Sequence, residues 1–123
     1  YGEETVTQSI KRWNSYTEAQ KDQIKAEGGA IYLDLVKAMP TGHASDETQA
    51  ILARWHEHIR YFYEPSIEVL GGLGQAYYDD PDFNAFFTAI HPDLPEFISK
   101  AIAVYVDKLE TAWLERELGI LQE

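Results

Sequence analysis

The chain has 123 residues, of which 45% are hydrophobic, so it is long enough for one domain with one core. Acidic residues outnumber basic residues 21 to 10, and the net charge of -11 disfavours contact with nucleic-acid phosphates and with anionic membranes. The absence of cysteine excludes disulfides, thiolate metal sites and a thiol nucleophile, and it fits a cytoplasmic protein. No apolar run approaches the ~20 residues of a membrane span. Because the chain starts at Tyr1 and its single methionine is Met39, we expect it to be part of a longer protein.

Helical patterns follow one another along the chain, and no strand alternation or hairpin signal interrupts them. The first helix is expected over about residues 5–13, with an apolar stripe so narrow that its stability alone should be poor. A capping-box pattern at residues 17–20 then opens a long helix to about Met39. Gly28 and Gly29 weaken the middle of this helix, which indicates a bend or the close approach of another element.

Four further helices are expected after the loop at residues 40–43. The third helix begins at Ser45 or Asp46 and continues to about Tyr63, before Pro65. The other three begin with a cap at Ser66, with Asp80-Pro81 and with Pro95, and the last reaches about Leu118. The helices differ in length and show no heptad repeat. The chain is therefore predicted to be a single all-α domain of five to six helices in a globin-like, crossed arrangement.

Three glycines at positions 71, 72 and 74 lie inside the predicted fourth helix, where they cost roughly 3 kcal/mol in helix propensity. No Lys-Ser/Thr pair follows them, so they do not form a phosphate-binding loop. The favoured interpretation is close contact with another helix. The alternative is an exposed backbone groove in which a ligand lies.

No catalytic or metal-binding signature stands out. His56 and His58 point about 200° apart around a helix, and Arg60 occupies the position where a zinc-protease motif needs its second histidine. The acidic stretch at residues 79–82 lacks the pattern of a calcium loop. We therefore expect no enzyme activity, no metal and no cofactor. His58 itself is either a ligand-binding side chain or a satisfied core histidine.

Aromatic residues number 16, and they are dense between Trp55 and Phe83. Most must pack in the core, but eight tyrosine hydroxyls also need polar partners, which a partly wet cleft provides. This composition suits the capture of a bulky, partly polar organic molecule. It favours a binding module over an enzyme.

In the order and spacing of four segments, the sequence resembles the TipA-S type of antibiotic-recognition domain, the effector domain at the C-terminus of some MerR-family transcription activators. The similarity covers about residues 1–107. Its segments are Ser15-Tyr16-Thr17, Trp55-x-x-His58-x-x-x-Phe62-Tyr63, Leu73-Gly74-x-x-Tyr77-x-x-Asp80-Pro81-x-Phe83 and Ala101-Ile102-Ala103-Val104-Tyr105.

The resemblance implies a globin-like fold without haem and a cleft for thiopeptide antibiotics or other bulky hydrophobic drugs. It also implies that the N-terminal segment, about residues 1–16, is a mobile lid that orders over the ligand. In the family, a winged helix-turn-helix and a dimerising coiled coil precede this domain, so DNA would be contacted by another part of a homodimeric protein. Some relatives trap thiopeptides through a cysteine after the Phe-Tyr pair. Glu64-Pro65-Ser66 stands there instead, which excludes covalent capture.

The predicted site is a cleft with two walls, a floor and a lid. It consists of Trp55, His58, Phe62 and Tyr63 as one wall, Leu73, Tyr77 and Phe87 as the second, Tyr105 as the floor, and Trp13 and Tyr16 from the lid. The expected function is drug sensing within a transcriptional activator. Two alternatives are a haem-binding globin-like sensor, with His58 or His91 as the axial ligand, and a plain protein-interaction domain with all its rings packed.

Overall fold

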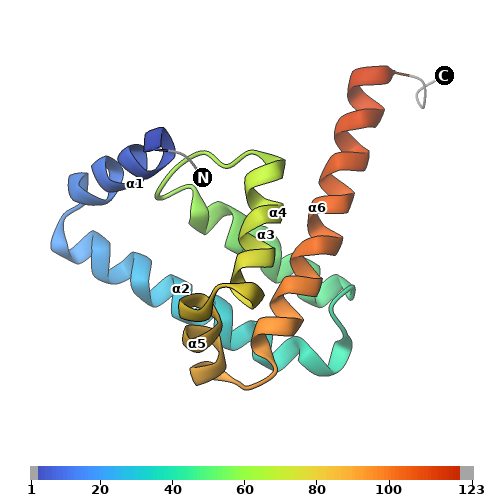
Figure 1. Cartoon of the computed structure of the whole chain (residues 1–123), viewed down its shortest axis with the longest axis horizontal. Coiled ribbons are helices and arrows are strands. Elements are labelled where there is room, and N and C mark those ends of the chain that lie inside the picture. The colour runs from blue at the N-terminus through green and yellow to red at the C-terminus, as the bar shows by residue number, and fades with distance from the viewer. Residues whose placement is uncertain (1–2, 120–123) are drawn as a thin grey trace.

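The computed structural model of the chain describes residues 3–119, and within that range it contains six α-helices, one short 3-10 helix and no strand. The elements are α1 (Glu3–Ser15), α2 (Glu18–Ala38), η1 (Met39–Thr41), α3 (Asp46–Ile59), α4 (Ile67–Asp79), α5 (Pro81–Ile90) and α6 (Leu94–Leu118). The helices run in several directions rather than as a parallel bundle (Figure 1). The predicted all-α, globin-like class is confirmed. The outermost residues of the predicted domain, 1–2 and 120–123, lie outside the described residues.

Side-chain caps set the starts of four helices. Thr17 and Gln20 form the predicted capping box at α2, with each side chain bonded to the other's backbone N–H. Ser45 accepts from the Thr48 N–H at α3, and Ser66 accepts from the Val69 N–H at α4. At α5 the carboxylate of Asp80 accepts from the N–H groups of the second and third helical residues. These predicted caps are confirmed, and each satisfies N–H groups that lack a partner within the helix.

Helix α3 ends at Ile59 and not near Tyr63, so it is shorter than predicted. Residues 60–63 instead form tight turns, in which the N–H of Tyr61 bonds to His58 and the N–H of Phe62 bonds to Ile59. The proline at position 65 disfavours helical geometry in the residue before it. A helix could therefore not continue through Glu64, and the turns at residues 60–63 lead the chain out of α3 before that point.

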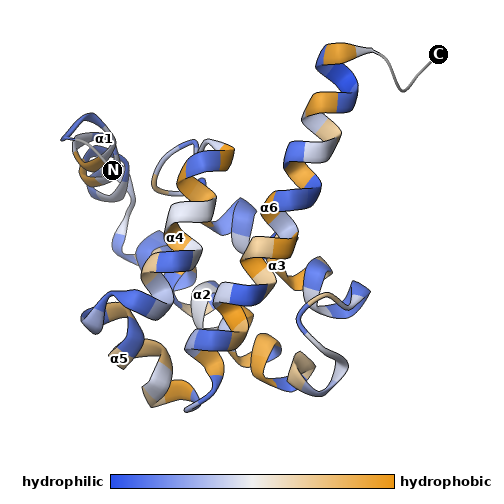
Figure 2. Cartoon of the chain, turned by 45° about the vertical axis from the view of Figure 1, so that its right-hand side comes forward, coloured by the Kyte–Doolittle hydropathy of each residue, from blue (hydrophilic) through white to orange (hydrophobic). Residues whose placement is uncertain are grey.

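The core lies where α2, α3, α4 and α6 meet. The most extensive packing joins α4 to α6, and the next joins α2 to α3. Hydrophobic residues gather at this junction, whereas the far end of α6 alternates between hydrophobic and hydrophilic positions (Figure 2). None of the described helices is both long enough and apolar enough to cross a lipid bilayer.

The glycines of α4 allow the close packing against α6. A Cβ at Gly74 would lie 2.7 Å from Ile102 Cγ2, a distance that real Cβ atoms do not tolerate. A Cβ at Gly71 would lie 3.8 Å from Val106 Cγ1, which is an ordinary contact. The predicted helix contact is confirmed, and it depends chiefly on Gly74.

Three aromatic side chains on α5 and α6 are open to solvent. Phe83 is 39% exposed, Phe86 is 54% exposed and Trp113 is 47% exposed. Helix α5 is short and buries only Phe87, so its other rings face outward. Trp113 lies in the C-terminal half of α6, and that end of the helix extends beyond the other helices (Figure 1). Helical periodicity identifies the apolar face of a helix, but it does not show where the neighbouring helices that cover this face end.

Candidate functional site

A cavity of about 350 Å³ opens between α1, α2, α5 and the end of α3. We call it the apolar cavity, because rings, aliphatic groups and glycine backbone form most of its lining. The lining residues are Trp13, Ile24, Lys25, Gly28, Gly29, Tyr32, His58, Phe62, Phe86 and Ile90. Its residues come from helices far apart in sequence, so the folded chain is required to form it.

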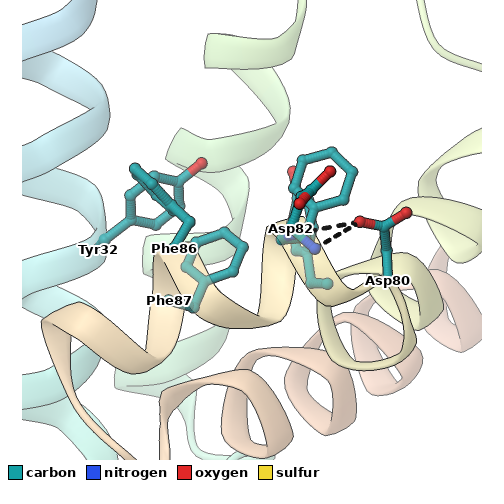
Figure 3. A pocket seen from close by; sticks show the side chains of 7 residues that line it. Tyr32, Asp80, Asp82, Phe86 and Phe87 are labelled. Carbon is teal, nitrogen blue, oxygen red and sulfur yellow. Dashed lines mark hydrogen bonds between the residues drawn. The ribbon is translucent and has the colours of Figure 1, made fainter.

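A second cavity, of about 530 Å³, adjoins the first at the N-terminus of α5. We call it the acidic cavity, and Figure 3 shows its side chains. They are Tyr32, Tyr77, Asp80, Asp82, Phe83, Phe86 and Phe87. Tyr32 and Phe86 line both cavities, so the two cavities adjoin at these rings, and we call the pair the aromatic cleft. Tyr32 meets Phe86 edge to face, with ring centroids 6.1 Å apart.

His58 packs closely against α2, because Gly28 has no side chain at the point of contact. A Cβ at Gly28 would lie 3.1 Å from His58 Cε1, so the glycine makes room for the imidazole. His58 Nε2 hydrogen-bonds the backbone carbonyl of Ile24 at 2.8 Å. The close approach predicted at Gly28 is confirmed. The histidine is both a satisfied, buried side chain and part of the cavity lining.

Helix α1 is attached to the molecule through its C-terminal end. Trp13 stacks on Phe62 with ring centroids 5.6 Å apart, and Arg12 Nη1 donates to the carbonyl of Arg60 at 2.9 Å. Just beyond the helix, Tyr16 donates to the carbonyl of Tyr61 at 2.6 Å. No residue of α1 is buried. The helix therefore stands apart from the body of the domain, as Figure 2 shows, and it contributes one ring to the cavity.

The two ends of the cleft differ in charge. The ammonium groups of Lys21 and Lys25 lie 5.5 Å and 5.8 Å from the centre of the Trp13 ring, within cation–π range, and Lys25 also lines the apolar cavity. At the other end the charged lining residues are Asp80 and Asp82.

Of the predicted site residues, Trp13, His58 and Phe62 meet in the apolar cavity, whereas Tyr77 and Phe87 line the acidic cavity. The other five lie outside both linings. Trp55 is completely buried and donates its indole N–H to the Tyr77 hydroxyl at 3.3 Å, and Leu73 is also buried in the core. Tyr63 is half-buried against the core. Tyr16 hydrogen-bonds the carbonyl of Tyr61, and Tyr105 contacts His56. Trp55 and Tyr105 are therefore not among the residues that line these two cavities. Whether any of these residues contacts a ligand stays a prediction.

Tyr105 belongs to a polar cluster on the outer side of α3. His56 Nδ1 lies 2.8 Å from the Tyr105 hydroxyl, and Arg60 pairs with both Glu57 and Glu64. Burial, followed by repulsion from Arg60, lowers the pKa of His56, whereas the two glutamates oppose this shift. Burial raises the pKa of Tyr105. The cluster favours a neutral imidazole.

Four residues line the cleft although the sequence pattern predicted no site role for them: Tyr32, Phe83, Phe86 and Ile90. A signal for Tyr32 was present, because it follows Gly28 by four residues and therefore shares its helix face. Burial raises the pKa of the Tyr32 hydroxyl, although a hydrogen bond with Tyr77 opposes the shift, so this hydroxyl is neutral near pH 7.

The geometry does not favour haem. His58 already uses Nε2 in its bond to the Ile24 carbonyl, and His91 Nδ1 accepts from the backbone N–H of Asp93. His91 would have to give up its hydrogen bond to become an axial ligand, whereas His58 has a lone pair for a metal only on Nδ1. Among residues 3–119, no group of three or more His, Asp or Glu side chains could hold a metal ion.

The chain is thus a small all-α domain with an aromatic cleft beneath a helix that contributes no buried residue. Residues 1–105 match the TipAS antibiotic-recognition domain, and the chain belongs to that family. It is 30% identical over 111 residues to the HTH-type transcriptional activator mta of Bacillus subtilis, covering 89% of this chain and 43% of the relative. It is 30% identical over 112 residues to the HTH-type transcriptional regulator SkgA of Caulobacter vibrioides, covering 85% of this chain and 44% of the relative. The chain thus spans less than half the length of these relatives. No solved structure matches it significantly.

Proposed function

We propose that this chain is the ligand-sensing domain of a transcriptional activator and that it binds bulky hydrophobic molecules, such as thiopeptide antibiotics, without a covalent bond. The observation that carries the proposal is the aromatic cleft, in which large rings remain partly exposed at the surface. Phe86, at its centre, is 54% exposed. A soluble domain leaves clustered rings uncovered at a cost in free energy, and a hydrophobic guest offsets that cost.

The sign and size of the binding energy follow from the buried area. Removing about 300 Å² of apolar ligand surface from water stabilises the complex by roughly 7 kcal/mol. Loss of ligand freedom and ordering of the lid offset several kcal/mol of this gain. We therefore expect micromolar affinity for ligands that fill the cleft.

The lid in this proposal is residues 1–16, with α1 at its centre. Val6 and Ile10 are 53% and 56% exposed, so the outer half of α1 has little apolar contact of its own. A ligand under Trp13 would add contact along the helix and favour its closed position. The DNA-binding half and the dimer contacts would lie in the remainder of the protein, and they would respond to this shift in population.

Replacement of Phe86 tests the cleft directly. In Phe86→Ala we expect the affinity for a neutral hydrophobic probe, N-phenylnaphthylamine, to fall by at least about tenfold, because the ring lines both cavities. The matched control is Tyr78→Ala, since Tyr78 is similarly exposed at 50% but lines neither cavity. Probe fluorescence gives the affinity, and urea unfolding checks that both variants fold.

Two outcomes would contradict the proposal. The first is the absence of saturable probe binding, as expected of a plain protein-interaction domain with no usable cleft. The second is an equal loss of affinity in the two variants, which would place the probe elsewhere on the surface. A thiopeptide that displaces the bound probe would support the proposed ligand class.

A further inference from the structure

The acidic cavity combines two features that one ligand group satisfies. Five aromatic rings line it, and its charged lining residues are Asp80 and Asp82. The rings form a connected set, in which the Tyr77 centroid lies 5.2 Å from that of Phe83 and 4.7 Å from that of Phe87. Aromatic faces carry negative quadrupole charge and attract cations, most strongly when carboxylates stand nearby.

The carboxylates have no cationic partner within the described residues. Neither Asp80 nor Asp82 forms an ion pair with a base in residues 3–119. The sequence explains why, because residues 61–99 contain no lysine or arginine. The acids in that stretch are Glu64, Glu68, Asp79, Asp80, Asp82, Asp93 and Glu96. The local field therefore favours a positive guest.

Other occupants fit the acidic cavity less well. An anion at the N-terminus of α5 would compete with Asp80, whose carboxylate already accepts from the N–H groups of Asp82 and Phe83. A small metal ion requires several oxygen ligands, and no such group of three occurs in the described part of the chain. A large, weakly hydrated organic cation needs no fixed ligand set and gains from the rings.

We propose that the acidic cavity binds the cationic head of an amphiphilic ligand, a quaternary ammonium, phosphonium or protonated alkylamine, whose hydrophobic body occupies the adjoining apolar cavity. This inference rests on the proposed function and names its ligand class. The charge at the opposite end fixes the orientation, because Lys25 repels the head from the apolar cavity while Asp80 and Asp82 attract it. Tyr32 and Phe86 then form the passage in which head and body join.

Three probes of similar hydrophobic character separate charge from burial. They are the cation tetraphenylphosphonium, the nearly isosteric anion tetraphenylborate and neutral N-phenylnaphthylamine, with each Kd measured by equilibrium dialysis. We expect the cation to bind at least about fivefold more tightly than the anion, since one exposed charge contact is worth on the order of 1 kcal/mol. Added salt should reduce this preference.

Substitutions locate the preference in the acidic cavity. Asp82→Asn should weaken cation binding by about fivefold, and Phe83→Leu should weaken it by about two- to fivefold through the loss of one ring face. Asp82→Asn should leave neutral-probe binding nearly unchanged, because it removes the charge and keeps the size of the side chain. The control is Asp93→Asn, which removes the same charge from a residue outside both cavities whose side chain makes no cap hydrogen bond. Thermal unfolding checks that each variant folds.

The outcomes separate this inference from the proposed function. If the neutral probe binds but the cation is not preferred over the anion, the cation site is wrong and the hydrophobic cleft stands. A preference that survives both Asp82→Asn and Phe83→Leu would also overturn the cation site. If none of the three probes binds, both proposals fail together.

Discussion

Single side chains account for the sharpest features of this domain. Gly28 leaves the space that His58 fills, and the imidazole forms a hydrogen bond with the carbonyl of Ile24. Trp55, three residues earlier on the same helix, is buried instead against Tyr77. One aromatic face of α3 is thus divided between the cleft and the core. The division depends on which helix lies opposite each residue.

His56 makes the stability of the fold dependent on pH. Its pKa is lowered in the folded state by burial and by Arg60. As pH falls below the ordinary histidine pKa of about 6.5, the unfolded chain therefore binds a proton at this residue more readily than the folded chain does. The contribution of His56 to stability is thus complete above that value and is lost progressively as pH falls toward the lowered pKa.

Replacement of His56 should flatten this dependence. We expect the free energy of unfolding to drop less between about pH 7.5 and about pH 5.5 in His56→Gln than in the unmodified chain. Urea denaturation at the two pH values measures the difference. His43→Gln is the control, because His43 lies outside the cluster around Tyr105. An unchanged slope in His56→Gln would refute the account of this cluster.

At the scale of elements, the contact between α4 and α6 determines how closely the core can pack. Gly74 and Gly71 lie on the same helix and differ in the space above them, which gives a matched pair. Gly74→Ala should destabilise the fold by about 1–3 kcal/mol, because the new methyl group meets Ile102. Gly71→Ala should be neutral or stabilising by up to about 1 kcal/mol, since helix propensity improves without a clash. Chemical denaturation distinguishes the two, and equal effects would contradict the packing described here.

The elements were largely predictable from the sequence, and the cleft was only partly so. Caps at Thr17, Ser45, Ser66 and Asp80 are local signals, because each depends on residues two or three positions away. The lining of a cleft is not local. The exposure of Phe86 follows from the shortness of α5, and the distance of Tyr105 from the cleft follows from the path of α6. Periodicity identifies the apolar face of a helix, but only tertiary packing decides which part of that face remains uncovered.

On the scale of the whole molecule, the domain consists of a packed body, α2 to α6, and one helix, α1, that has few contacts with it. Helices α2 to α6 share the buried core, whereas α1 contributes no buried residue and touches the body near Phe62 and Tyr61. Such an element is the least costly part of the fold to move. In the proposed function, a ligand under Trp13 would change the position of α1 without disturbing the core.

The three tryptophans report on three regions of the molecule, and their indole N–H signals test the central claim most directly. Trp13 lines the apolar cavity, Trp55 is buried beside Tyr77, and Trp113 lies exposed on α6, outside the cleft. A two-dimensional proton–nitrogen NMR titration with a hydrophobic ligand should shift the Trp13 indole signal in a saturable way and leave the Trp113 signal in place. Saturable shifts confined to Trp113, or no shift at Trp13 while the ligand binds, would show that the cleft under α1 is not the binding site.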